Sequence, residues 1–372
     1  EALHHYLSLR FIPPPRTMLR GIKKLPPAHI LVFQGGEITI TRYWDLYFRR
    51  KLDLSESELL DRLHEVLTQT VKSHLMSDVP IGAFLSGGMD SSMIVGIMAK
   101  DLGASFQTFA IGVEEQDFDE LPYAAMVAER YHTAHVEERV EARLIHSLPK
   151  MIWHLDEPSD PITACQFYAA ELAARHVKVV LGGDGGDELF AGFDRYWGVD
   201  HIGYYTWIPS PIRQRVLGPM IAQIPDSFTY KSLTQKLRWV HQLSQSPTLA
   251  ERYAEATCFF RFNHQGKQKL YGDGLWHQVG HLNSADVIVR QFRNGNAGEP
   301  LDRMLYADFM TRLPEHSLML TDRMTMAHAV EARVPYLDHR VVDAVMRMPP
   351  EWKLTEPESA GSPDEPVVPA PD

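Results

Sequence analysis

Two glycine-rich loops, each directly behind a short apolar segment, constrain the fold of this chain more than any other feature of its sequence. The apolar segment 79–85 leads into the loop SGGMDSS at 86–92, and the apolar segment 177–181 leads into the loop GGDGGDE at 182–188. A short apolar run that ends in glycine is typical of a buried strand in a parallel sheet. We therefore expect both loops at the carboxyl ends of strands, where sheets of this kind bind ligands.

The surrounding sequence repeats this pattern of strand, loop and helix. Apolar runs at 106–111 and 135–140 predict two more strands, and the helical spacing at 120–131 predicts a helix between them. The pattern favours an α/β fold in which a mostly parallel, twisted sheet carries helices on both faces. Residues 198–350 have helical spacing and lack clear strands, so we expect a helical C-terminal half packed against the sheet.

The two ends of the chain differ in character from this central part. Period-two apolar alternation around a glycine turn predicts a β-hairpin at 29–43. Ser55 and Glu58 form a capping box that predicts a helix from about residue 55, and a new domain begins with it. Residues 355–372 hold five prolines and no Lys or Arg, so we predict a disordered or anomalous tail.

The composition disfavours several classes of protein. The 372 residues are 44% hydrophobic and 23% charged, as in a globular protein with a sizeable core. The net charge of −11 repels nucleic acid and anionic membranes, so we predict neither as a partner. Cys165 and Cys258 lie far apart without metal-ligand spacing, which suggests no disulfide framework and no zinc site and indicates the cytoplasm. No apolar run is long enough to span a bilayer.

The first loop has the composition of a phosphate cradle. Its paired glycines let the backbone approach an anion, its serines add hydroxyl donors, and the helix that follows directs N–H groups at the same point. Asp90 would repel a bare phosphate but suits Mg²⁺, which one or two carboxylates usually bind together with substrate phosphates. The alternative is a structural turn that caps a helix, with Asp90 stabilised by the helix dipole.

The second loop combines four glycines with three carboxylates. Ordering glycines costs backbone entropy and the like charges repel, so this composition is expensive for a purely structural turn. A bound cation or a cationic intermediate would relieve the repulsion, whereas the alternative is an exposed acidic turn. Together the two loops predict a magnesium-nucleotide enzyme.

These residues also resemble a known family. SGGMDSS is similar to the pyrophosphate loop of the N-type ATP pyrophosphatases, and with LGGDGGDELFAGFDRY it resembles the synthetase domain of glutamine-hydrolysing asparagine synthetases. Residues 109–112, 156–158 and 321–338 agree with the same family, and the resemblance covers roughly residues 51–353. It implies an adenine nucleotide alpha hydrolase-like sheet.

The resemblance also implies a domain division. Residues 1–50 look like the C-terminal remnant of a glutaminase domain with its linker, residues 51–354 like the ATP-dependent synthetase domain, and residues 355–372 form the tail. Family members have a cysteine nucleophile at the N-terminus of the glutaminase domain and a lysine beyond the position of residue 354. Neither occurs in this sequence. We therefore interpret the chain as a fragment, without glutaminase activity of its own.

The resemblance implies a two-step ligase reaction that uses ATP and Mg²⁺. The side-chain carboxylate of aspartate attacks ATP to give an adenylate and pyrophosphate, and ammonia, obtained from glutamine in the full-length protein, then displaces AMP. A homodimer is a further expectation. The implied ATP and pyrophosphate site consists of Leu85, Ser86, Gly87, Gly88, Asp90, Ser91, Ser92, Ile111, Gly182 and Gly183, and the implied magnesium ligands are Asp90 and Asp187.

Asp184 is the implied catalytic residue. It stands where family members usually carry a glutamate that deprotonates the attacking ammonia, and an aspartate can do the same if the loop lies about 1 Å closer. The shorter side chain leaves the nucleophile open between ammonia and another amine.

Other functions stay open on the sequence. A related amidotransferase could act on another carboxylate, such as a cell-wall or peptide acid, or close a ring as β-lactam synthetase does. A non-catalytic nucleotide-binding module is the alternative from a different class.

Overall fold

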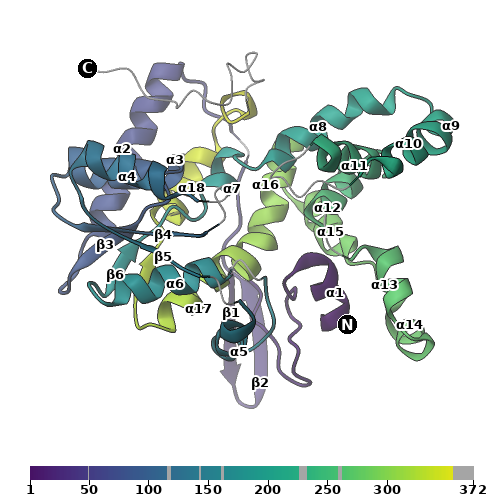
Figure 1. Cartoon of the computed structure of the whole chain (residues 1–372), viewed down its shortest axis with the longest axis horizontal. Helices are drawn as coiled ribbons and strands as arrows, with labels where there is room; N and C mark the ends of the chain where they lie inside the picture. The colour runs from purple at the N-terminus through teal and green to yellow at the C-terminus, as the bar shows by residue number, and fades with distance from the viewer. Residues whose placement is uncertain are drawn as a thin grey trace.

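A five-stranded parallel sheet forms the centre of one half of the molecule (Figure 1). The structure, a computed structural model, describes residues 1–48, 50–114, 119–141, 144–160, 163–225, 233–258 and 262–354. In order across the sheet, the strands are β5 (Ala134–Arg139), β4 (Gln107–Gly112), β3 (Ile81–Phe84), β6 (Val179–Leu181) and β7 (Glu331–Arg333). The predicted parallel sheet is confirmed.

The chain order of the strands creates a switch point at β3. From β3 the chain builds outward to β4 and β5, and it then returns to the opposite side of β3 to add β6. Loops that leave the carboxyl ends of two strands at such a point diverge and leave a crevice between them. The two glycine-rich loops follow β3 and β6, so the topology places both of them at this crevice.

Helices cover both faces of the sheet, as the sequence predicts. Figure 1 shows α2, α3 and α4 on one side of the strands and α6 and α17 on the other. The buried positions of β6 and Phe109 of β4 are apolar because a sheet covered on both faces has no wet side. The bounds are α2 (Glu56–His74), α3 (Met89–Gly96), α4 (Leu121–Tyr131), α5 (Leu144–Leu155), α6 (Thr163–Ala174), α17 (Met319–Met326) and α18 (His339–Met346).

The helix α2 begins where the capping box predicts. The Ser55 side chain accepts a hydrogen bond from the backbone N–H of Glu58, and the Glu58 carboxylate accepts one from the backbone N–H of Ser55 at 2.9 Å. Leu59, Leu67 and Val71 bury one face of the helix. The prediction of a helix start at residue 55 is therefore confirmed.

The predicted helical half lies beside the sheet half (Figure 1). Its longer helices are α8 (Asp194–Thr206), α11 (Leu233–Leu243), α12 (Leu249–Cys258), α15 (Ala285–Asn294) and α16 (Pro300–Met310). Its shorter elements are α7 (Gly186–Phe190), α9 (Ser210–Ile212), η3 (Arg213–Leu217), α10 (Gly218–Gln223), α13 (His264–Leu270), α14 (Asp273–Val279) and η4 (Leu313–Leu318). Three further short helical elements are η1 (Ile97–Asp101), η5 (Pro335–Leu337) and η6 (Pro350–Trp352).

One strand falls in the region predicted to lack strands. The edge strand β7 is only three residues long, with one exposed and two half-buried positions. It is held by backbone bonds, such as the 2.9 Å bond from the N–H of Gly182 to the carbonyl of Arg333. A Glu-Ala-Arg strand has no apolar run, and the sequence prediction was wrong here for that reason.

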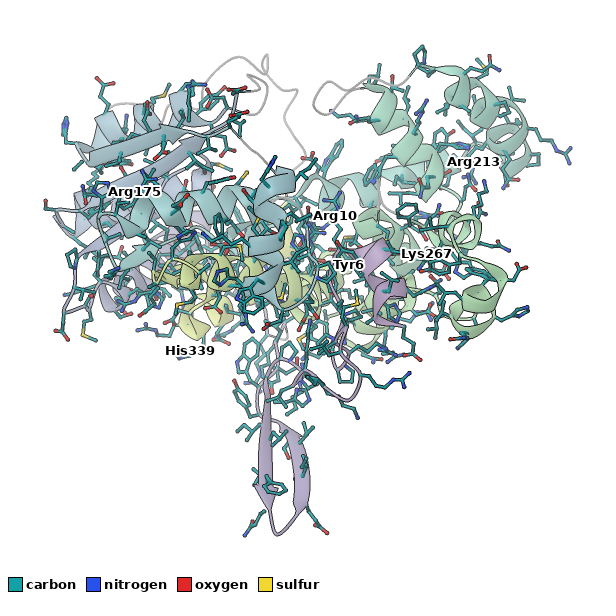
Figure 2. All side chains as sticks on the ribbon, turned by 60° about the horizontal axis from the view of Figure 1, so that its bottom comes forward. Tyr6, Arg10, Arg175, Arg213, Lys267 and His339 are labelled. Atoms are coloured by element: carbon teal, nitrogen blue, oxygen red, sulfur yellow. The ribbon has the colours of Figure 1, made fainter. Side chains whose placement is uncertain are left out.

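The N-terminal segment contains the helix α1 (Ala2–Leu9) and the predicted hairpin of β1 (His29–Gln34) and β2 (Glu37–Arg42). Gly35 and Gly36 form its turn with φ of 61° and 86°, values that suit the turn types favoured in two-residue hairpins. Figure 2 shows the hairpin projecting away from the rest of the molecule. The predicted tail at 355–372 lies outside the described residues. Among the helices that the structure describes, none has the length and apolar character needed to cross a membrane.

Candidate active site

The two glycine-rich loops lie in direct contact with each other. A Cβ on Gly186 would come within 2.3 Å of the Asp90 Cγ, and a Cβ on Gly183 within 2.9 Å of the Ser91 backbone nitrogen. No side chain fits at such distances, so the glycines of the second loop are required for the first loop to approach. Residues far apart in sequence are brought together in this way.

A cleft of about 300 Å³ opens where the loops meet, and we call it the loop cleft. Its lining residues are Phe84, Ser86, Asp90, Ser91, Gly182, Gly183, Asp184, Gly185, Asp187, Glu188, Phe193 and Ser317. The sequence-predicted residues in this set are Ser86, Asp90, Ser91, Gly182, Gly183, Asp184 and Asp187. The remaining predicted residues, Leu85, Gly87, Gly88, Ser92 and Ile111, are not among those that line it.

Leu85 and Ile111 lie on the sheet beside the cleft. The Leu85 side chain is buried in the core, and its backbone N–H donates to the carbonyl of Phe109 at 2.9 Å. Ile111 is half-buried on β4. Because the Leu85 side chain belongs to the core, only its backbone is left to contact a ligand.

The first loop is held in shape by its own serines. The Ser86 hydroxyl accepts from the backbone N–H of Gly88 at 3.2 Å, and the Ser91 hydroxyl contacts that of Ser86 at 3.0 Å. Gly88 is the N-cap of α3, so the N–H groups of the first helical turn face the loop. In the described part of the chain, the buried hydroxyl of Ser92 has no hydrogen-bond partner. An anion in this loop would find donors already in place.

Carboxylates dominate the electrostatics of the loop cleft. Burial, with the neighbouring charges of Asp187 and Asp184, raises the pKa of Asp90 to about 6. Burial, followed by the neighbouring charge of Asp308, raises the pKa of Glu188 to about 7. The described lining residues include four carboxylates and neither Lys nor Arg. The cleft is therefore suited to a cation, or to a ligand that carries one.

The donor set fits magnesium only together with a nucleotide. Among the described residues, no group of three or more His, Cys, Asp or Glu side chains is arranged to hold a metal ion. Mg²⁺ does not need such a cage, because it usually binds one or two carboxylates and completes its shell with substrate phosphates and water. Asp90 and Asp187, beside the serine-lined loop, supply that number of carboxylates.

Asp184 is half-buried, and two successive hydrogen bonds hold its carboxylate. The Thr321 hydroxyl donates to Asp184 Oδ1 at 3.0 Å, and the Gln166 amide Nε2 donates to the Thr321 hydroxyl oxygen at 2.8 Å. Burial raises the pKa of Asp184, while the Thr321 hydrogen bond lowers it. Sequence reasoning missed both partners: Thr321 opens the family-like stretch 321–338, but nothing in the sequence marks Gln166.

A buried polar network forms the wall behind Glu188. Ser317 donates to Glu188 Oε1 at 3.5 Å, and Glu188 itself is only 2% exposed. Asp308 lies nearby and accepts hydrogen bonds from the Arg195 guanidinium and, at 2.6 Å, from the Tyr196 hydroxyl. Glu188 stands in the glycine-rich loop quoted above, yet its membership in the cleft lining was not predicted.

The N-terminal segment is pinned to the helix that carries Ser317. Lys24 pairs with Glu157 at 2.5 Å and with Glu315 of η4 at 2.8 Å. Asp160 likewise pairs with Arg10 at 2.5 Å and with His316 of η4 at 3.1 Å. Figure 2 shows Arg10 and Tyr6 at the junction between the two halves of the molecule. The position of η4 at the cleft therefore depends on contacts from residues 1–24.

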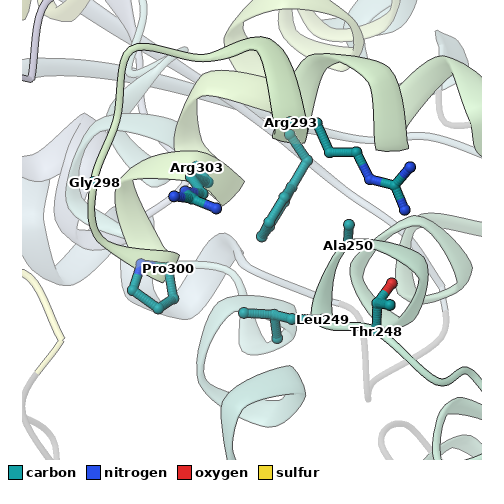
Figure 3. A pocket seen from close by; sticks show the side chains of 8 residues that line it. Thr248, Leu249, Ala250, Arg293, Gly298, Pro300 and Arg303 are labelled. Atoms are coloured by element: carbon teal, nitrogen blue, oxygen red, sulfur yellow. The ribbon is translucent and has the colours of Figure 1, made fainter.

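A second pocket, of about 330 Å³, lies among α12, α15 and α16 (Figure 3). Its charged lining residues are Arg293 and Arg303, and the rest of its lining is mostly apolar. It contains none of the loop residues and takes no part in the candidate active site.

Comparisons with known proteins show the family of this chain. The sequence model of the family described as asparagine synthase matches residues 62–360. The chain is 32% identical over 356 residues to asparagine synthetase [glutamine-hydrolyzing] 1 of Bacillus subtilis (strain 168). The aligned region covers 95% of this chain and 54% of that protein. It is 26% identical over 367 residues to amidase chyE of Penicillium rubens, covering 91% of this chain and 54% of the relative. The chain spans about half the length of the curated relatives it matches.

Proposed function

Because this chain belongs to the asparagine synthase family, we propose that it is an ATP-dependent ligase that forms an amide. In this proposal it activates the side-chain carboxylate of aspartate with ATP and transfers ammonia to it, giving asparagine, AMP and pyrophosphate. The observation that carries the proposal is the loop cleft itself, where a serine-lined anion loop meets four carboxylates at the switch point of a parallel sheet.

The first loop is proposed to hold the phosphates of ATP. Its residues in this role are Ser86, Gly87, Gly88, Ser91 and Ser92. Among the described residues the Ser92 hydroxyl has no hydrogen-bond partner, and the N–H groups at the start of α3 face the loop. Both support this assignment, because both are donors that an anion would satisfy. Gly182, Gly183 and the backbones of Leu85 and Ile111 are proposed to border the adenosine part.

Asp90 and Asp187 would hold Mg²⁺ together with the nucleotide. The ion supplies neutralisation of phosphate charge when it is bound. The raised pKa of Asp90 supports this role, since crowded carboxylates of this kind gain most from a cation.

The proposed reaction has two steps. A carboxylate oxygen of aspartate attacks the α-phosphorus of ATP, and the bond from that phosphorus to the pyrophosphate oxygen breaks. The nitrogen of ammonia then attacks the activated carbonyl carbon, the bond to the AMP oxygen breaks, and Asp184 takes a proton from the nitrogen. Most of what the loops contribute is positioning.

Domain division and location belong to the same proposal. The change from an exposed hairpin to the capped helix α2 supports a boundary near residue 50, and the scarcity of cysteine supports a cytoplasmic protein.

Pyrophosphate release from Mg-ATP by the 372-residue chain, with and without aspartate and ammonium, tests the proposal. We expect release that requires aspartate. Release with another carboxylic acid alone would overturn the substrate and favour a related amidotransferase. The absence of any release, together with unchanged ATP affinity in Asp90→Asn, would refute catalysis and favour a nucleotide-binding module.

A further inference from the structure

We infer that Thr321 and Gln166 are positioning residues that hold Asp184 ready to accept a proton from the attacking amine. The inference rests on the proposed function, because it concerns the second step of that reaction. It adds two residues that act through Asp184 and have no proposed contact with ATP.

The hydrogen bonds among the three side chains all point toward the carboxylate. A threonine hydroxyl has a single proton, and here that proton goes to Asp184 Oδ1 at 3.0 Å. The hydroxyl oxygen can then only accept, and it accepts from Gln166 Nε2 at 2.8 Å. Donors directed at a carboxylate favour its ionised form, which is the form that can take up a proton.

The orientation of the Gln166 amide is set by this chain of bonds. In the part of the chain that the structure describes, the buried Gln166 Oε1 has no hydrogen-bond partner. The amide therefore gains its bond to Thr321 while its oxygen stays unsatisfied, and no other partner fixes it in place. The polar contact of the Gln166 amide in the described structure is therefore the one to Thr321.

The three residues come from separate, well-packed elements. Gln166 lies on α6 and Thr321 on α17, and these two helices pack against each other. Thr321 is 5% exposed. Asp184 Oδ2 faces Gly182, where a Cβ would lie 3.0 Å away. Thr321 thus holds one carboxylate oxygen, and the other lies on the side of Gly182.

The hydrogen bonds also oppose the effect of burial. Burial alone raises the pKa of Asp184 and would favour the neutral acid, which cannot accept a proton. The Thr321 hydroxyl acts in the opposite direction and lowers the pKa. A backbone hydrogen bond of Asp184 acts in the same direction. The described residues that line the loop cleft include no Lys or Arg that would add to this effect.

The test measures the two steps of the reaction separately in the variants Thr321→Val and Thr321→Ser. Aspartate-dependent exchange of labelled pyrophosphate into ATP, without ammonium, reports the first step, and asparagine formation with saturating ammonium reports both. We expect Thr321→Val to keep exchange within about twofold and to lose about 10- to 100-fold in kcat for asparagine. This is less than the roughly 100- to 10,000-fold of a whole general base, because the variant keeps Asp184 itself. Thr321→Ser, which keeps the hydroxyl, should restore most of that loss.

Gln166→Glu provides a second variant of nearly unchanged size. A carboxylate at 166 attracts the Thr321 proton away from Asp184, so we expect the same selective loss as in Thr321→Val. Thr325→Val is the matched control, because the buried Thr325 hydroxyl donates only to backbone carbonyls of α17, such as that of Thr321 at 2.8 Å. It should leave the ratio of the two rates unchanged.

Equal loss of exchange and asparagine formation in Thr321→Val would overturn the inference, as would full activity in that variant. If the unsubstituted chain exchanges pyrophosphate but the variants show no selective loss, only the inference fails. If the unsubstituted chain shows no exchange at all, the proposed function fails and the inference falls with it.

Discussion

At the scale of single residues, the candidate site depends on positions where a side chain would prevent the loops from meeting. Gly186 lies against the Asp90 carboxylate, and Gly192 lies against Asp187, where a Cβ would be 2.2 Å from Oδ1. Both of the proposed magnesium ligands are therefore packed against glycine. The glycines set where the carboxylates lie, and the carboxylates set the charge of the cleft.

Replacing Gly186 should separate the loops. We expect Gly186→Ala to weaken Mg-ATP binding at least tenfold, because its Cβ must displace the Asp90 side chain. Isothermal titration with a non-hydrolysable ATP analogue and Mg²⁺ measures this. Gly203→Ala on α8 is the control, since nothing lies within 4 Å of its Cβ and alanine there favours the helix by about 1 kcal/mol. Equal affinities in the two variants would contradict the loop contact.

Removing the Asp90 charge should separate function from stability. We expect Asp90→Asn to lose magnesium-dependent turnover and yet to melt about 2–4 °C higher at pH 7, because a carboxylate with a raised pKa disfavours folding once it is ionised. The gain should shrink at pH 5, where Asp90, with its pKa of about 6, is mostly protonated in the folded chain. Thermal melting at both pH values checks this, with the exposed Asp61→Asn on α2 as the control. A lower melting temperature for Asp90→Asn would contradict the argument.

The sequence predicts some residues of the site and not others for a physical reason. Asp90, Asp184 and Asp187 stand in contiguous loops whose composition is itself unusual, so they can be found without a structure. Thr321 and Gln166 are ordinary helical residues 155 positions apart. Their role appears only once α6 and α17 are packed together, because it depends on one hydroxyl proton and its direction.

At the scale of elements, the cleft is held together by a segment that contributes no lining residue. The helix η4 carries Ser317, which lines the loop cleft. On the same helix, Glu315 pairs with Lys24 and His316 pairs with Asp160. The N-terminal segment thus restrains an element of the site from a distance.

Asp160 should stabilise the folded chain in a way that depends on pH. Although burial opposes it, hydrogen bonds from His316 and Arg10 hold the pKa of Asp160 well below its usual range. A carboxylate with a lowered pKa stabilises the fold above its unfolded pKa of about 3.9, and this stabilisation is lost as the pH falls below that value. We expect Asp160→Asn to cost about 2–3 kcal/mol at pH 7, less than a fully buried pair because Arg10 is partly exposed.

Denaturant unfolding of the unsubstituted chain and of Asp160→Asn at pH 7 and pH 3 measures the effect. The difference between the two proteins should shrink by roughly 1 kcal/mol at the lower pH. A difference that stays constant or grows toward pH 3 would assign the cost to packing rather than to the ion pairs.

Elements differ in how far the sequence predicts them. The start of α2 follows from a local capping box and the hairpin from its alternation, so both could be identified in advance. The strand β7 could not, because an edge strand of three residues with exposed and half-buried side chains is stabilised by backbone pairing to β6, which leaves no local signal.

At the scale of the whole molecule, two structural halves meet at one acidic site. Asp90, Asp184, Asp187 and Glu188 account for part of the net charge of −11 and converge on the loop cleft. These carboxylates repel one another in the folded chain without ligand, and a bound cation relieves that repulsion. Ligand and metal should therefore stabilise the molecule together.

We expect ATP with Mg²⁺ to raise the melting temperature. At a ligand concentration 100 times Kd, binding adds about 2.7 kcal/mol to the free energy of unfolding. ATP with EDTA should give much less, because phosphates alone would add negative charge to an acidic cleft. Differential scanning fluorimetry over a nucleotide titration checks this. Equal stabilisation with and without magnesium would contradict the proposed roles of Asp90 and Asp187.

The central claim is that the chain activates a carboxylate by adenylation. Aspartate labelled with ¹⁸O in its side-chain carboxylate, incubated with the chain, Mg-ATP and ammonium, tests it most directly by mass spectrometry of the phosphorus products. The proposed function predicts one labelled oxygen in AMP for each asparagine formed and none in pyrophosphate. Label in inorganic phosphate alongside ADP, or AMP without label, would contradict it.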